Sequence, residues 1–229
     1  MTKRQEMSAA QFMAELDSDP ESVARRRVLE DSVAKRSQQM ALVLQPVLAD
    51  LSDAGYESAN LNDLVERYAP LPQDVAKILR RWLSQISEPT VKEQIVRSLA
   101  ASAERFPGTE LVATFETATA ESLRWAIANT MAESRPSGLE RWLAGALSNE
   151  HYGKAREMLL VAAARLLSPV EANMLILPFL RRMPLHAAKA LAESGGLNEL
   201  AVLEERLGVT KGMEHKEIER AIRKIRKRL

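Results

Sequence analysis

Apolar residues recur along this chain at a spacing that places them on one side of successive helices. Val91, Ile95 and Leu99 stand four residues apart, which is the spacing of a single stripe along an α-helix. The pattern returns three times after a step of 32 residues and once more after a step of 31. The later stripes are Leu123/Ile127/Met131, Ala155/Leu159/Ala163, Ala187/Leu191/Gly195 and Ile218/Ile222. This pattern predicts five helices that each bury one face.

A second amphipathic segment precedes each of these stripes. The five segments are residues 73–86, 110–117, 139–147, 170–180 and 197–207. A pair of amphipathic helices can bury its apolar faces only by stacking on neighbouring pairs, so a near-constant period is typical of a solenoid. The pattern therefore predicts an α-solenoid of about five helical hairpins. Chance periodicity in a helical chain rich in Ala and Leu is the alternative interpretation.

The chain before residue 56 is predicted to form a helical extension. Asp19 followed by Pro20 is typical of an N-cap and a first helical turn, and the helix runs on toward Leu51. Pro46 lies inside this helix, which predicts a kink or a break near Gln45. Aromatic residues make up only 4% of the chain and long alternating β-branched runs are missing, so strands are not expected. We expect an all-α protein with residues 1–55 as extension or cap and residues 56–229 as the repeat array.

Several segments resemble HEAT repeats. Residues 90–100 (TVKEQIVRSLA) and 187–195 (AAKALAESG) look like the second helix of such a repeat. Residues 197–207 followed by 214–229 look like a terminal repeat with its capping helix. From about residue 40 onward, the chain is similar to small bacterial HEAT-like proteins, with PVLADL at 46–51 as part of a helical extension. The resemblance implies a right-handed α-solenoid whose second helices line a concave surface. The period is shorter than the usual HEAT length and the Asp-x-x-Val-Arg signature is incomplete, so the resemblance specifies fold rather than activity.

Composition and charge exclude several classes of function. The 229 residues are 46% hydrophobic and 28% charged, with 32 Lys and Arg against 31 Asp and Glu, so the net charge is only +1. This balance argues against a globally basic or acidic surface. The chain has no cysteine, which excludes disulfides, thiolate metal sites and cysteine nucleophiles. Met1 to Glu6 form no apolar signal core and no stretch approaches the length of a membrane span, so we expect a cytoplasmic protein without membrane contact.

No catalytic or cofactor-binding pattern is found in the sequence. The three histidines, His151, His186 and His215, are far apart and in no metal-ligand spacing. Nucleophile elbows and glycine-rich phosphate loops are also missing. We therefore expect no catalytic residues, no metal and no cofactor.

The resemblance to HEAT repeats defines a candidate binding surface. Positions two and six after the start of each stripe point away from it, because residues on a helix are about 100° apart. In the second helices, these positions would line the concave surface. The row reads Glu93/Arg97, Trp125/Asn129, Glu157/Val161, Lys189/Glu193 and Arg220/Lys224. We expect the partner-binding residues to be Glu93, Arg97, Trp125, Asn129, Glu157, Lys189, Arg220 and Lys224.

Mixed charge with one aromatic residue favours a protein or peptide partner. A nucleic-acid groove would be mostly Lys and Arg, whereas protein interfaces tolerate mixed charge around aromatic side chains. Trp125 is the candidate hot spot of this row, and the open alternative is that the N-terminal helix around residues 40–48 folds back over this surface and buries the ring.

One segment keeps a nucleic-acid function open. Residues 214–229 hold seven basic side chains against three acidic ones, a net charge of +4. A polar terminal cap is the favoured interpretation of this segment, because cations complement a helix C-terminus. The alternative is nucleic-acid binding, which includes a HEAT-like alkylpurine DNA glycosylase with Trp125 and either Glu93 or Glu157 in its pocket.

Overall fold

The computed structural model describes residues 8–229, so the interpretation of Met1 to Glu6 lies outside the described residues. Within this range the chain forms thirteen α-helices and two short 3₁₀ helices, and two isolated bridges stand in place of strands. The all-α prediction is confirmed. The chain divides into two compact units, residues 1–45 and 46–229. This division lies ten residues before the boundary expected at residue 55. The fully buried Val47 and Leu51 belong to the second unit.

The first unit contains α1 (Ala9–Ser18) and most of α2 (Pro20–Asp53). Asp19 accepts hydrogen bonds from the backbone N–H groups of Glu21 and Ser22, and Pro20 is the first helical residue, so the predicted N-cap is confirmed. The side-chain hydrogen bond from Ser22 is the main cause that lowers the pKa of Asp19. The helix α2 runs through Pro46 without interruption, so the break considered near Gln45 does not occur. A proline removes one backbone hydrogen bond, and the flanking turns stay helical.

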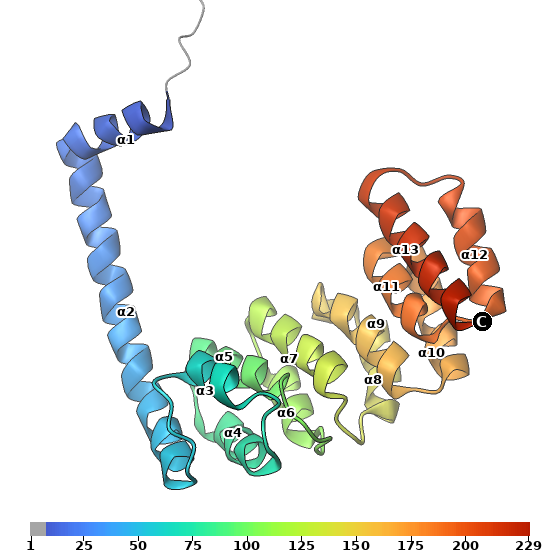
Figure 1. Cartoon of the computed structure of the whole chain (residues 1–229), viewed down its shortest axis with the longest axis horizontal. Helices are drawn as coiled ribbons and strands as arrows, with labels where there is room; N and C mark the ends of the chain where they lie inside the picture. Colours follow the sequence, from blue (N-terminus) through green and yellow to red (C-terminus); the bar gives the residue numbers. More distant parts are fainter. Residues whose placement is uncertain (1–7) are drawn as a thin grey trace, which may run out of the picture. The chain divides into compact units, whose positions relative to one another are not determined.

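The second unit holds α3 (Leu61–Tyr68) and then five successive helix pairs (Figure 1). A 3₁₀ turn, η1 (Glu150–Tyr152) or η2 (Leu177–Leu180), stands inside each of the third and fourth pairs. The pairs are α4 (Gln73–Gln85) with α5 (Pro89–Leu99), α6 (Thr109–Thr117) with α7 (Glu121–Ser134), α8 (Glu140–Ser148) with α9 (Ala155–Leu166), α10 (Pro169–Ile176) with α11 (Pro184–Ser194), and α12 (Leu197–Leu207) with α13 (Gly212–Arg228).

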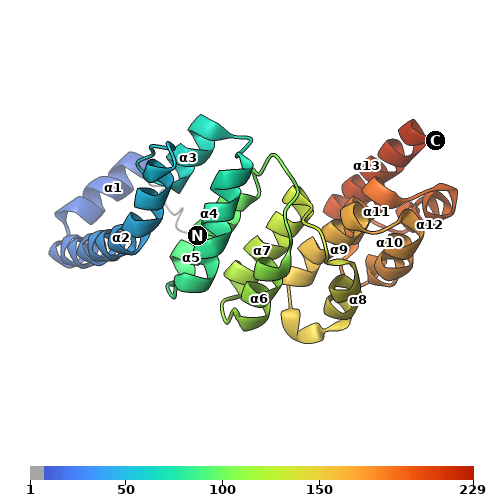
Figure 2. The ribbon, with the colours of Figure 1, turned by 90° about the horizontal axis from the view of Figure 1, so that it is seen from below.

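The second helices of these pairs pack on one another in chain order. The helix α5 contacts α7, α7 contacts α9, α9 contacts α11, and α11 contacts α13. Each of these helices also contacts the first helix of its own pair (Figure 2). The predicted stripes lie in these contacts, and Ile95, Ile127 and Leu159 have no exposed surface, as predicted. The core of the second unit is therefore a continuous series of helix-to-helix contacts.

Local sequence signals set several helix ends. Ser168 and Glu171 form a reciprocal capping box at the start of α10, with Pro169 at the first helical position. The stripe position at Gly195 requires the absence of a side chain, because a Cβ atom there would stand 2.6 Å from the backbone oxygen of Leu191. It would also stand 3.0 Å from Cδ1 of Ile225, so glycine allows α13 to approach the end of α11 closely.

Candidate functional site

All eight predicted binding residues lie on the five second helices. Glu93 and Arg97 belong to α5, Trp125 and Asn129 to α7, Glu157 to α9, Lys189 to α11, and Arg220 and Lys224 to α13. Arg97, Lys189, Arg220 and Lys224 are exposed, and the other four are partly buried.

Val161, which belongs to the same predicted row, is fully buried and cannot line a surface. The helix α9 contacts α7 on one side and α11 on the other, so it buries a wider arc than a single stripe. The consecutive residues 158–163 of α9 are all buried as a result.

Most charged members of the row form ion pairs within the chain. Arg97 pairs with Glu93 at 2.7 Å along α5, and Arg220 pairs with Glu217 at 2.7 Å along α13. The two residues of each pair are one helical turn apart on an exposed helix surface, where such ion pairs contribute little to the stability of the fold.

Two further members of the row connect neighbouring helices. Lys224 of α13 pairs with Glu193 of α11 at 2.8 Å. Oε2 of Glu157 on α9 stands 3.6 Å from Nδ1 of His186 on α11. Lys224 and Glu157 therefore contribute to packing between helices as well as to the surface.

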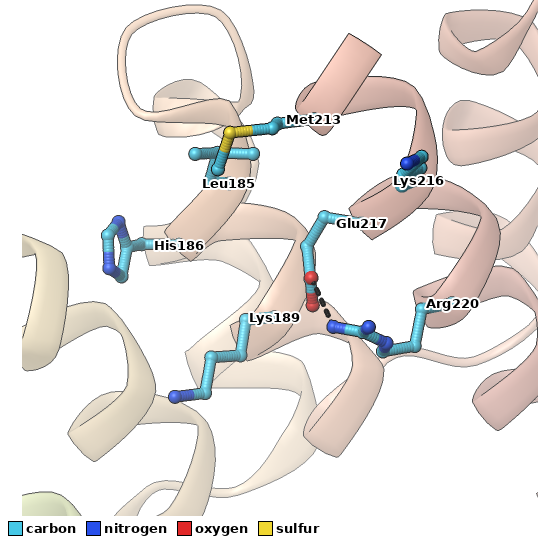
Figure 3. A pocket seen from close by; sticks show the side chains of 7 residues that line it. All are labelled: Leu185, His186, Lys189, Met213, Lys216, Glu217 and Arg220. Carbon is cyan, nitrogen blue, oxygen red and sulfur yellow. Dashed lines mark hydrogen bonds and ion pairs between the residues drawn. The ribbon is translucent and has the colours of Figure 1, made fainter. Parts of the chain in front are cut away.

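A groove lies between α11 and α13 at one end of the row (Figure 3). Its volume is about 420 Å³, and it includes the predicted residues Lys189 and Arg220. At one end, the side chain of Met213 lies beside Leu185, and at the other end Lys189 lies near the Glu217–Arg220 ion pair (Figure 3). The full lining is Leu185, His186, Lys189, Met213, Lys216, Glu217 and Arg220. The groove therefore combines an apolar end with a charged end.

The charges of the groove are unbalanced. Lys189 and Lys216 form no ion pair within the described part of the chain, and both are exposed. Glu217 is the single carboxylate of the lining, and it already pairs with Arg220. The groove consequently offers two unpaired ammonium groups to a ligand.

An ion-pair network next to the groove was not predicted from the sequence. Arg165 of α9 contacts Glu133 of α7 at 2.9 Å and Glu193 of α11 at 3.5 Å. Burial raises the pKa of Glu193, but the hydrogen bonds and charges of Lys224 and Arg165 outweigh this effect and hold the pKa below its ordinary value of 4.5. Glu133 and Arg165 are 32 residues apart, so a pair of opposite charges at the repeat spacing is the sequence signal that could have predicted this ion pair. The network connects four second helices, α7, α9, α11 and α13.

The three tryptophans differ in their surroundings. Nε1 of Trp82 donates to Asp50 at 2.7 Å, and Nε1 of Trp142 donates to Glu116 at 2.6 Å. The apolar neighbours of Trp82 and Trp142 in the sequence predict core positions for both rings, but the structure leaves both only partly buried. Trp125 is also partly buried, but its indole makes no hydrogen bond within residues 8–229. Its role as a hot spot stays a prediction.

The basic segment at the C-terminus is largely used inside the fold. Arg228 donates to the backbone oxygens of Ala192 and Glu193, each at 2.9 Å. It also donates to the backbone oxygen of Gly195, so it satisfies carbonyl groups at the C-terminal end of α11. Arg226 pairs with Glu204 of α12 at 2.6 Å. These contacts agree with the interpretation of α13 as a cap.

Within residues 8–229, no three His, Cys, Asp or Glu side chains are grouped as metal ligands would be. None of the helices in this range is both long and apolar enough to span a bilayer.

Comparisons of the chain with protein-family models, with curated proteins and with solved structures find no match. The function of the chain therefore has to be inferred from its own residues.

Proposed function

We propose that this chain is a non-catalytic scaffold that binds a protein or peptide partner on the surface formed by its second helices. The observation that carries the proposal is the groove between α11 and α13, where Leu185 and Met213 adjoin unpaired lysines. Protein interfaces combine apolar contacts with a polar rim in this way.

The proposal includes a right-handed HEAT-like α-solenoid over residues 56–229, with residues 1–55 as its helical extension. The chain-order contacts of α5, α7, α9, α11 and α13 support it, because each pair of helices buries its apolar face on the next pair. In such an array the second helices form one continuous surface, so Trp125 and Asn129 would share it with the groove. A cytoplasmic location belongs to the same proposal.

Affinity capture from the native cell lysate, with and without nuclease, tests the proposed function. We expect a protein to be retained after nuclease treatment. The variant Trp125→Ala should weaken this capture by about 2 kcal/mol or more, the range of interface hot spots, and should leave the melting temperature nearly unchanged. A large loss of stability with unchanged affinity per folded molecule would instead place Trp125 in the core.

Nucleic-acid binding is the second candidate function. The observation that favours it is that Lys216 and Lys227 of α13 are exposed and form no ion pair within the described residues. Retention of nucleic acid alone, lost on nuclease treatment, would favour this candidate. The glycosylase form of this alternative requires Trp125 to share a base-binding pocket with Glu93 or Glu157.

A further inference from the structure

We propose that the groove between α11 and α13 binds an acidic peptide segment that carries a large apolar side chain beside its carboxylates. This inference rests on the proposed protein-binding function and specifies the chemistry of the partner at one site.

The charge of the groove is the first argument. Its lining contains three Lys and Arg side chains and one Glu, a local excess of two positive charges, whereas the whole chain carries a net charge of only +1. Lys189 and Lys216 line this groove from different helices, α11 and α13. Since neither lysine has an ion-pair partner in the described chain, a ligand carboxylate could pair with each without breaking an existing contact.

Arg220 adds a third contact for a carboxylate. One terminal nitrogen of its guanidinium, Nη1, donates to Glu217, and 70% of the side chain is exposed. An arginine has five N–H donors, so most of them stay available after one such bond. Glu217 holds the guanidinium at the groove and thereby orients the remaining donors.

The apolar end of the groove is the second argument. Met213 is 75% exposed at the start of α13, and its side chain lies beside Leu185 (Figure 3). Methionine side chains adapt to the shape of an apolar partner and are frequent at binding surfaces that accept varied sequences. A Leu, Met or Phe side chain of the ligand would cover Met213 while neighbouring carboxylates pair with the lysines.

The same features argue against a phosphate backbone as the ligand. Glu217 would repel phosphates, and Met213 and Leu185 offer no donors to them. A peptide can match both ends of the groove, because one extended segment can carry charged side chains and an apolar side chain next to each other.

Selection from a display library of short random peptides tests the proposal without assuming a sequence. The library is panned in parallel on the full chain, on the double variant Lys189→Glu/Lys216→Glu, and on the control Lys77→Glu. Lys77 is an exposed lysine of α4, a helix that packs on α5 and α6, so this control makes a single charge reversal, half that of the double variant, away from the groove. All three lysines are exposed, and circular dichroism melting checks that each variant folds.

We expect peptides of net negative charge with one large apolar residue to be enriched on the full chain. Fluorescence anisotropy should show binding about tenfold or more weaker for the double variant, because like charges across an interface oppose binding. The control should bind within about twofold of the full chain, and added salt should weaken binding because exposed charges are screened. Met213→Ser should weaken binding and leave the salt dependence in place.

Three results would overturn the proposal. These are enrichment of neutral or basic peptides, equal binding to the double variant, and no enrichment at all. Peptides that ignore the groove substitutions but are lost with Trp125→Ala would leave the proposed function standing at another site. Retention of nucleic acid alone in the capture experiment would remove the proposed function itself.

Discussion

Arg156 of α9 is the only buried charged residue among those whose side chains the structure describes. Its guanidinium stands 5.8 Å from the ring centroid of Phe179, and within residues 8–229 it makes no hydrogen bond or ion pair. Arg124, 32 residues earlier, stands 5.7 Å from the ring of Tyr152 in the same way. Each arginine therefore lies over the aromatic side chain of the 3₁₀ turn in the following helix pair: Arg124 over Tyr152 of η1, and Arg156 over Phe179 of η2. Only Nε of Arg156 is both fully buried and without a hydrogen bond, so the terminal nitrogens stay in contact with solvent, and the cation–π contact of about 0.5–2 kcal/mol offsets part of a reduced desolvation cost.

We predict that Arg156→Met leaves the free energy of unfolding unchanged or raises it. Methionine fills a similar volume and stays in contact with Phe179, and it removes a charge that has no counter-anion in the described chain. Urea unfolding of the purified protein measures the change. Arg156→Ala serves as the control, and it should destabilise because it leaves a cavity. A large loss of stability with methionine would mean that the charge itself is needed.

The stripe residues allow a second prediction at this scale. Leu159 has no exposed surface, so Leu159→Ala should lower the free energy of unfolding by about 2–5 kcal/mol through loss of burial and formation of a cavity. Leu197→Ala makes the same chemical change at a residue that is 71% exposed, and it should change stability by less than about 0.5 kcal/mol. Urea unfolding compares the two variants. Equal losses would contradict the assignment of Leu159 to the core.

At the scale of the elements, polar contacts accompany apolar packing between second helices. Glu133 of α7, Arg165 of α9, Glu193 of α11 and Lys224 of α13 form one chain of ion pairs. Nη1 of Arg165 also donates to the backbone oxygen of Ala132 at 3.1 Å. Arg165 is only 16% exposed, so its pairs are shielded from water more than those along a single helix. The network therefore adds directional contacts to stripes that are otherwise apolar.

We predict that Glu193→Gln destabilises the fold at neutral pH, by about 1–2 kcal/mol for a partly buried pair, and that the difference disappears in acid. The pKa of Glu193 in the folded chain is held below 4.5, so its ionised form stabilises the fold above pH 4.5. This contribution is lost as the pH falls through the lowered folded pKa. Urea unfolding of the wild type and the variant across this range measures the difference. Glu219→Gln removes an exposed contact with Arg223 and should have little effect at any pH, and equal behaviour of the two variants would contradict the role of Glu193.

The helix pairs could be predicted from the sequence because burial repeats at a fixed spacing. Each stripe, from Val91 to Ile222, lies in contacts with neighbouring helices, and such burial requires apolar residues at a regular spacing that a single sequence shows.

The surface residues could be predicted less well than the core. Val161 was assigned to it by its angle on α9, but contacts on both sides of that helix bury it. Lys189 and Lys224 both belong to the predicted row, but only Lys224 pairs with an acidic residue of a neighbouring helix, Glu193 of α11. The repeat spacing shows which opposite charges could pair across helices, but three-dimensional distances decide which of them do.

For the molecule as a whole, the two candidate functions differ in the distribution of charge that they require. The net charge of +1 leaves no general attraction to a polyanion. Within the first unit, Arg25 pairs with Glu21 at 3.1 Å and Arg26 with Asp17 at 2.7 Å. In the second unit, Arg226 and Arg228 of α13 are bound to groups of the fold itself. Exposed cations that form no ion pair within the described residues are therefore scattered over several elements, among them Lys77 of α4, Arg141 of α8 and Lys216 of α13.

We predict that duplex DNA binds this protein weakly and without sequence preference, with a dissociation constant of about 10 µM or weaker at physiological salt, in the range of non-specific binding. We expect Lys216 and Lys227 to contribute phosphate contacts, because both lie on the basic helix α13, are exposed and form no ion pair within the described chain. The variant Lys216→Glu/Lys227→Glu should reduce the dependence of affinity on salt, since each phosphate contact releases counterions. Fluorescence anisotropy over a series of salt concentrations measures both quantities, and Lys77→Glu shows the effect of a single charge reversal away from α13. Submicromolar binding at physiological salt with a slope of several phosphates would reverse the order of the two candidates, since scattered exposed cations do not form a surface that contacts several phosphates at once.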